Sequence, residues 1–198
     1  MKIMKRKNLL VRLFTVAALI NLAACQNVTD DLVPSDEDNR PQVEEGTVGH
    51  LPGQVTEDFT LADSHGASVR LADQLQGGAT PADAVVLYFT MWCPICLSHS
   101  DHLVGTVTPH FATRGTVRYY LIDYVSGSVA GARAAELANG YDGSALVTVA
   151  DVDQAVFDQF DAAMGTVVVI DATGTIHVNE DYRDGTALRS ALDAILPP

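Results

Sequence analysis

One stretch decides the fold of this chain: YFTMWCPIC, residues 88–96. It begins inside an apolar run at 84–90, rich in β-branched and aromatic residues, which predicts a buried strand leading to two cysteines. Pro94 suits the first turn of a helix, where its missing N–H would have had no partner. Cys93 would then lie at the helix N-terminus, where unpaired N–H groups favour a thiolate. Cys96 lies on the same helical face and within reach of a disulfide.

The rest of the chain alternates between strand-like and helix-like segments. Strands are expected at 58–61, 68–71, 84–90, 117–125, 145–149, 166–170 and 175–178, and helices at 71–75, 94–111, 129–138, 152–160 and 185–196. This alternation predicts an α/β fold. We expect a central mixed sheet that is flanked by helices on both faces, with parallel pairing between strands that a helix separates. The first two strands form a predicted N-terminal β-hairpin extension, and a tight turn makes the last two strands an antiparallel hairpin. Sites in such sheets form at the carboxyl ends of strands, where the cysteines lie.

The first 24 residues have the features of a secretory signal. A basic start is followed by an apolar run at 9–24, which ends in small residues directly before Cys25. This ending resembles a bacterial lipobox, and the resemblance implies cleavage before Cys25 and lipid on its sulfur and new N-terminus. A transmembrane anchor is the alternative, but the run is short against the ~20 residues of a membrane span. We therefore expect a lipoprotein signal peptide at 1–24.

Residues 25–47 are polar and acidic, which predicts a disordered tether between the lipid on Cys25 and a single domain at 48–198. Beyond residue 24 the chain has 7 basic and 25 acidic residues, a formal net charge of −18. Such an acidic chain is a poor partner for nucleic acid or for an anionic membrane surface. The membrane contact that we expect is the lipid on Cys25.

The two other cysteines, Cys93 and Cys96, would be the only free thiols of the exported domain. Outside the cytoplasm a cysteine pair can be structural, catalytic or metal-binding. A bridge across two residues closes a very small loop and adds little as a structural staple. A functional role for the pair is therefore the stronger hypothesis.

Several short motifs, taken in order, resemble those of a known family. They are DFTLAD at 58–63, WCPIC at 92–96, VID at 169–171 and GTI at 174–176. They match the opening strand, the active-site motif and the closing hairpin of extracytoplasmic thioredoxin-like redoxins of the TlpA/ResA and AhpC/TSA kinds. The resemblance covers roughly residues 51–196. It implies a thioredoxin-like fold and a thiol-disulfide oxidoreductase activity.

The resemblance also implies roles for individual residues. Cys93 would attack a partner disulfide and Cys96 would resolve the mixed disulfide, with no cofactor beyond this redox-active pair. The implied partners are protein thiols and disulfides, and a membrane electron donor or acceptor. The implied location is the periplasmic side of the bacterial cell envelope, and the outer membrane is favoured where there are two membranes. The active-site rim would consist of Trp92, Pro94, Thr90, Met164 and Gly165.

Two positions depart from the family pattern. The family has a cis-proline just before the strand that follows residue 165, whereas this chain has Gly165 after Met164. Thioredoxins place a buried acid six residues before the first cysteine, where this chain has Leu87. A proton acceptor for the cysteines must then come from elsewhere, and Asp83 would substitute only if the strand starts late.

Two histidines, His99 and His102, follow the cysteines on one helical face. Polar residues on an exposed helix face are the simplest interpretation. The second is a protonated histidine that lowers a thiol pKa, or a proton relay through His99 and His102. The third interpretation is metal binding.

Copper delivery is one rival to disulfide exchange. It would use Cys93, Cys96 and His99 as soft ligands, with Met91 or His102 as further ligands. The exported copper proteins related to Sco, however, typically space their cysteines by three residues. The spacing of two residues in this chain argues against copper delivery.

Peroxide reduction is a second rival. A thiol peroxidase would use Cys93 within a Thr-x-x-Cys motif at 90–93, with Arg118 near the sulfur. The proline that peroxiredoxins place four residues before Thr90 is Val86 in this chain. A third hypothesis is an anchored binding module, whose function would survive the loss of both cysteines.

Overall fold

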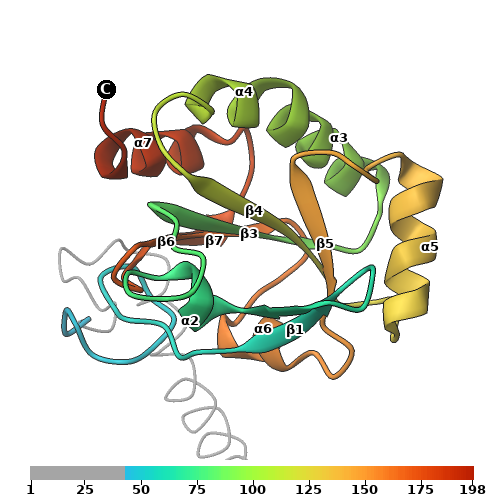
Figure 1. The fold of residues 1–198 in the computed structure, drawn as a ribbon, viewed down its shortest axis with the longest axis horizontal. Coiled ribbons are helices and arrows are strands. Elements are labelled where there is room, and N and C mark those ends of the chain that lie inside the picture. Colours follow the sequence, from blue (N-terminus) through green and yellow to red (C-terminus); the bar gives the residue numbers. More distant parts are fainter. Residues whose placement is uncertain (1–42) are drawn as a thin grey trace, which may run out of the picture. The chain divides into compact units, whose positions relative to one another are not determined.

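The computed structural model describes residues 43–198 (Figure 1). The predicted signal at 1–24, the lipidated Cys25 and most of the predicted tether lie outside the described residues. Residues 43–47, the last of that tether, form a turn whose backbone bonds to residues 53–55. The boundary between tether and domain at residue 48 stays a prediction. Within residues 43–198 we find no helix that is long and apolar enough to cross a membrane.

Seven strands of the described chain form one mixed sheet in the order β2-β1-β5-β4-β3-β6-β7. Strands β3, β4 and β5 are parallel, β1 is antiparallel to β2 and β5, and β7 is antiparallel to β6. The predicted mixed sheet with an N-terminal hairpin is therefore confirmed. The bounds are Thr60–Asp63 (β1), Ser68–Arg70 (β2), Ala84–Thr90 (β3), Val117–Asp123 (β4), Leu146–Ala150 (β5), Thr166–Asp171 (β6) and Ile176–Asp181 (β7).

Helices cover both faces of the sheet, as predicted (Figure 1). Helices α3, α4 and α7 lie over one face, α2 and α6 lie over the other, and α5 packs beside β5. Their bounds are Leu71–Gln74 (α2), Pro94–His102 (α3), Thr108–Phe111 (α4), Val129–Asn139 (α5), Ala155–Gln159 (α6) and Thr186–Ile195 (α7).

Strand β3 runs through the centre of the core, and all seven of its residues are buried. Because side chains alternate along a strand, Tyr88 packs with Cys96 of α3, whereas Leu87 packs with Phe160 on the opposite face. Each fully buried large apolar side chain contributes about 1.5–3 kcal/mol to stability. The strand therefore fixes the position at which the chain leaves the core, just before Cys93.

The predicted helix at 94–111 is divided into three pieces. Helix α3 is followed by a π-helical turn, Leu103–Val107, and then by α4. Pro109 has no N–H to donate to the carbonyl of Gly105, and its ring would clash with that oxygen in a regular helix. A wide turn directly before Pro109 relieves this clash.

The predicted helix at 152–160 is shorter in the structure and begins only at Ala155. The carboxylate of Asp151 accepts the backbone N–H groups of Val156 at 3.3 Å and Phe157 at 2.7 Å. Gln154 has a left-handed φ of +57°, which ends the turn before the helix begins. Asp151 therefore sets the start of α6.

Strand β6 lies antiparallel to β3, although the helix before it predicted parallel pairing. The connection from β5 starts at Asp151, whose N–H bonds to the carbonyl of Asp123 at the end of β4. It ends at Gly165, whose N–H bonds to the carbonyl of Phe89 near the end of β3. Because both ends of the connection lie at the carboxyl edge of the parallel strands, β6 starts at that edge. This topology brings Gly165 to the cysteines.

Candidate active site

Cys93 follows β3 and caps the N-terminus of α3. Its Sγ accepts the N–H of Cys96 at 3.3 Å and lies 3.0 Å from the Sγ of Cys96. Both are free thiols, but Cys93 is half-buried whereas Cys96 is fully buried. Pro94 occupies the first helical turn, as the sequence predicted, and is exposed. One partly exposed sulfur thus lies next to a buried one.

The surroundings of Cys93 lower the pKa of its thiol. The largest cause is the hydrogen bond with the Cys96 side chain, followed by bonds from backbone N–H groups at the start of α3. These donors stabilise the thiolate relative to the thiol. Cys93 therefore combines exposure with thiolate character, the two properties that a nucleophilic cysteine needs.

Trp92, next to Cys93, is held in an uncommon backbone conformation with φ at +61°. Its N–H donates to Oγ1 of Thr90 at 3.1 Å, and its indole Nε1 donates to Oδ2 of Asp123 at 2.8 Å. The buried Asp123 also accepts the N–H of Ser126 at 2.9 Å. A bulky residue at positive φ is strained, and such strain clusters at functional sites. These hydrogen bonds hold the strained tryptophan in place.

The loop before β6 faces the cysteines although it contains no proline. Gly165 has φ at +84° and donates its N–H to the carbonyl of Phe89 at 3.0 Å. A Cβ at this position would lie 3.3 Å from Oδ1 of Asp181, so a side chain would be both strained and crowded. The preceding residue, Met164, places its Sδ 3.4 Å from the Sγ of Cys93. Residues 43–198 contain no cis peptide bond.

His99 and His102 each bond to a tyrosine. The hydroxyl of Tyr88 lies 2.9 Å from Nδ1 of His99, and the hydroxyl of Tyr182 lies 2.8 Å from Nδ1 of His102. The ring of Tyr182 also packs on His99, with 4.7 Å between the ring centroids. Both histidines are half-buried, so the structure does not place them on an exposed helix face.

Tyr88 connects His99 to the buried Cys96. Burial first and then the nearby Cys96 sulfur raise the pKa of the Tyr88 hydroxyl, which shares the core cluster of Cys96. Desolvation lowers the pKa of His99, and the negative charge of Asp181 opposes this only in part. His99 is therefore neutral at pH 7, and its Nδ1 can accept the hydrogen bond of the Tyr88 hydroxyl.

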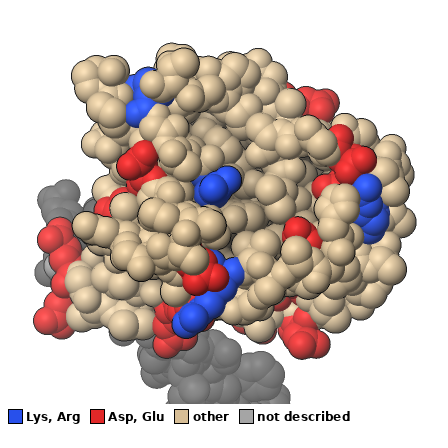
Figure 2. Space-filling model, viewed as in Figure 1, with Lys and Arg blue, Asp and Glu red and all other residues tan. Residues whose placement is uncertain are grey.

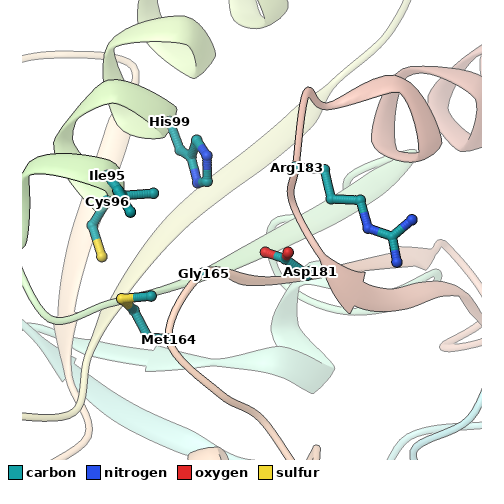
Figure 3. Close-up of a pocket in the computed structure, with 7 residues that line it drawn as sticks. All are labelled: Ile95, Cys96, His99, Met164, Gly165, Asp181 and Arg183. Carbon is teal, nitrogen blue, oxygen red and sulfur yellow. The ribbon is translucent and has the colours of Figure 1, made fainter.

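A pocket of about 280 Å³ opens beside the cysteines (Figure 3). The sulfur atoms of Cys96 and Met164 point toward one another across it, whereas the imidazole of His99 points away from both. Asp181 and Arg183 add one charge of each sign on the side away from the sulfur atoms. The lining residues are Ile95, Cys96, His99, Met164, Gly165, Asp181 and Arg183.

Three residues that the sequence linked to the site lie elsewhere. Leu87 packs on the face of β3 opposite to Cys96. Asp83 precedes β3 and Arg118 lies near the start of β4, so both lie at the end of the parallel strands that is remote from the cysteines. Because β3 starts at Ala84 as predicted, the condition under which Asp83 would replace the missing acid is not met. The expectation that Arg118 stands near the sulfur is wrong.

Four polar residues around the cysteines were not expected from the sequence: Tyr88, Asp123, Asp181 and Tyr182. The position of Asp123 could have indicated a site residue, because Asp123 ends the apolar strand that was expected to pair with the cysteine strand. The carboxyl ends of parallel strands meet at one edge of the sheet. Tyr88 gave no such indication, since a tyrosine within an apolar strand is ordinarily a core residue.

A second polar group contains His65, Glu136 and Asp142, whose ligand atoms lie within 4.8 Å of one another. Nη1 of Arg133 lies 2.6 Å from a carboxylate oxygen of both Glu136 and Asp142. The guanidinium already supplies the positive charge between these carboxylates. This group is therefore explained as an ion-pair network.

Solved structures show which fold the chain has. A proposed protein disulfide isomerase from Bacteroides thetaiotaomicron is 19% identical, with a TM-score of 0.61 over 74% of this chain and 90% of that one. The thioredoxin domain of a thiol-disulfide oxidoreductase from Bacteroides vulgatus is 18% identical, with a TM-score of 0.57 over 74% and 99%. A peroxidoxin from Mycobacterium tuberculosis is 23% identical, with a TM-score of 0.54 over 73% and 97%. The chain therefore has a thioredoxin-like fold, as the sequence predicted.

No protein-family model and no curated protein matches the sequence.

Proposed function

We propose that the protein is a thiol-disulfide oxidoreductase that exchanges electrons with protein disulfides through Cys93 and Cys96. One observation carries the proposal: an accessible sulfur at a helix N-terminus lies 3.0 Å from a buried second sulfur. A pair that served only as a staple would not need one exposed thiol with a lowered pKa. The similar fold of a thiol-disulfide oxidoreductase supports the same activity.

The proposed reaction has two steps. The Cys93 thiolate attacks one sulfur of the partner disulfide, which forms a mixed disulfide and releases the other partner sulfur as a thiolate. Cys96 then loses its proton and attacks the Cys93 sulfur, so that the bond to the partner breaks. The partner leaves with both cysteines reduced, and Cys93 and Cys96 form a disulfide. Two electrons pass from the pair to the partner, and the reverse sequence would oxidise a partner dithiol.

The second step needs a proton acceptor next to the buried Cys96. The Tyr88 hydroxyl lies near this sulfur, which raises the pKa of Tyr88, and it bonds to Nδ1 of His99. As the Cys96 proton passes to the Tyr88 oxygen, the Tyr88 proton passes to His99, whose positive charge then faces Asp181. Tyr88 and His99 thus supply a proton path that does not need an acid at position 87, whose side chain lies on the opposite face of β3. His102 bonds to Tyr182 instead and is a supporting residue in this scheme.

The location follows from the sequence features at the N-terminus. We place the domain outside the cytoplasm, anchored by lipid on Cys25 to the cell envelope, with a membrane protein as its electron donor or acceptor. On the face drawn in Figure 2, basic side chains occur singly among acidic ones and form no basic patch. Such a surface suits protein partners better than nucleic acid.

Peroxide reduction has less support. The peroxidoxin shares the fold, but Arg118 lies at the end of the parallel strands remote from Cys93. The large side chain of Trp92, held by its hydrogen bond to Asp123, also occupies one side of the site. A binding module that does not use its cysteines leaves their geometry unexplained.

Trp92 is the only tryptophan of the chain, so its fluorescence can report oxidation of the adjacent Cys93. The full chain in detergent, with Cys25→Ser to leave two thiols, would be reduced and mixed with a peptide disulfide or with hydrogen peroxide. We expect the fluorescence to change faster with the peptide disulfide than with hydrogen peroxide. A variant that also carries Cys93→Ser should show no change with either reagent. A faster change with peroxide would make the protein a peroxidase and refute the proposal.

A further inference from the structure

Three sulfur atoms from two separate segments meet at the active site. The Sγ of Cys93 lies 3.0 Å from the Sγ of Cys96 and 3.4 Å from the Sδ of Met164. The disulfide-exchange reaction uses two of these atoms and gives the third no role. Met164 is 39% exposed, so its thioether is directed at the cysteines without being buried in the core.

We propose that Cys93, Cys96 and Met164 form a binding site for a soft monovalent metal ion, Cu(I), in the reduced protein. Thiolates and thioethers are the ligands that select Cu(I), whereas magnesium and calcium require oxygen ligands. Binding releases the two thiol protons and forms two thiolate–copper bonds and one thioether–copper bond. No atom changes its oxidation state. The site goes beyond disulfide exchange and does not depend on it.

The distances favour three-coordinate over two-coordinate binding. With metal–sulfur bonds of about 2.3 Å, a trigonal site needs about 4.0 Å between sulfur atoms, whereas a linear site needs about 4.6 Å. The sulfur atoms lie 3.0 and 3.4 Å apart, so a trigonal site requires movements of about 1 Å or less per pair. The unbranched side chain of Met164 is half-exposed and can adjust by rotation about its single bonds.

The third ligand differs from the one that the sequence analysis considered. Nδ1 of His99 is bonded to the Tyr88 hydroxyl, and its ring points away from the sulfur atoms (Figure 3). Met91 is 43% exposed. Met164 is therefore the ligand that the geometry supplies.

The pocket and the charges suit a monovalent cation. Cys96 lines the pocket together with Met164, so the ion has a path to the buried sulfur. Two thiolates and one Cu(I) leave a single negative charge, next to the N-terminus of α3, whose N–H groups already bond to Cys93. A neutral thioether is a poor ligand for Zn²⁺, which usually takes four nitrogen, thiolate or carboxylate ligands.

The test uses the full chain in detergent with Cys25→Ser, reduced and free of oxygen, in competition with a chromophoric Cu(I) chelator. We expect one Cu(I) per chain and three sulfur neighbours by X-ray absorption. Met164→Leu should leave two sulfur neighbours and weaken the affinity by about tenfold or more, as loss of a supporting group at a metal site typically does. The matched thioether control, Met91→Leu, should leave the affinity within about twofold.

An affinity that falls with His99→Gln but not with Met164→Leu would overturn the assignment, as would Zn²⁺ binding as tightly as Cu(I). Far-ultraviolet circular dichroism of Met164→Leu would show that its fold is intact. Oxidation to the Cys93–Cys96 disulfide should abolish binding, because no thiolate remains. Disulfide exchange is measured separately with the metal-free protein, so either proposal can fail while the other stands.

Discussion

Two hydrogen-bonded clusters flank the cysteine pair and act on it in different ways. The tryptophan cluster, Trp92, Asp123 and Ser126, joins a strained residue to a buried carboxylate and bonds to neither sulfur. The histidine cluster contains Tyr88, His99, Tyr182 and His102, and reaches the buried sulfur of Cys96 through Tyr88. The first cluster fixes the shape of the site, whereas the second can move a proton. Shape and proton transfer are thus supplied by two separate clusters.

The largest expected effect is the loss of stability when the carboxylate of the tryptophan cluster is removed. Asp123→Ala would leave the partly buried indole N–H of Trp92 and backbone N–H of Ser126 without their acceptor. We expect a loss of roughly 3 kcal/mol in the free energy of unfolding, measured by urea denaturation. Asp153→Ala, which removes an exposed acid, is the matched control and should change it by less than about 0.5 kcal/mol. An unchanged stability of Asp123→Ala would show that the carboxylate does not hold Trp92.

The next effect is on the rate at which Cys96 resolves the mixed disulfide. His99→Gln removes the proton acceptor and should slow this step on the order of 100-fold at pH 7, the lower end of general-base contributions. The pH dependence should change as well, since hydroxide would replace the imidazole as the acceptor. Single-turnover quenching at several pH values would measure both. An unaltered pH profile would reduce His99 to a structural role.

A smaller effect is expected for the second histidine. His102→Gln loses the hydrogen bond to Tyr182, which is worth about 1 kcal/mol of stability, but it leaves the bond between Tyr88 and His99 intact. The resolving rate should therefore stay within about threefold of the parent rate. Equal rate losses for His99→Gln and His102→Gln would mean that the two histidines act as one unit.

The smallest effect is the pH dependence of stability. The pKa of His99 is lowered in the folded protein, chiefly by desolvation. The unfolded chain therefore binds a proton at a higher pH than the folded one, so stability falls as pH drops from the ordinary histidine value toward the lowered value. His99→Gln should flatten this part of the curve. Urea midpoints between pH 7 and pH 5 would check the slope, and an equally steep curve for the variant would contradict the assignment.

The sequence predicted the strand that leads to the cysteines better than the segments that follow them. The strand at 84–90 was confirmed to the residue, because its apolar run is bounded by turn signals. The division of the helix at 94–111 was missed although Pro109 was a visible signal. The antiparallel pairing of β6 with β3 was not predicted. It depends on the hydrogen bonds that fix both ends of the connection after Asp151, and these bonds join residues far apart in the sequence.

The proton path was hidden for a simple geometric reason. The family pattern places an acid at position 87, but side chains alternate along a strand and Leu87 faces away from Cys96. Its neighbour Tyr88 faces Cys96, and a tyrosine in an apolar run carries no signal of its role. The bond to His99 joins residues from a strand and a helix, so no local pattern could have predicted it.

The most direct test of the account is to trap the mixed disulfide. The Cys96→Ser and Cys93→Ser forms of the full chain, each with Cys25→Ser, would be mixed with a peptide disulfide and followed by mass spectrometry of the intact protein. The account predicts a stable one-to-one mixed disulfide at Cys93 in Cys96→Ser, and formation at least about 100-fold slower in Cys93→Ser, whose remaining thiol is buried. Equally fast trapping by Cys93→Ser would contradict the division of roles between the two sulfur atoms.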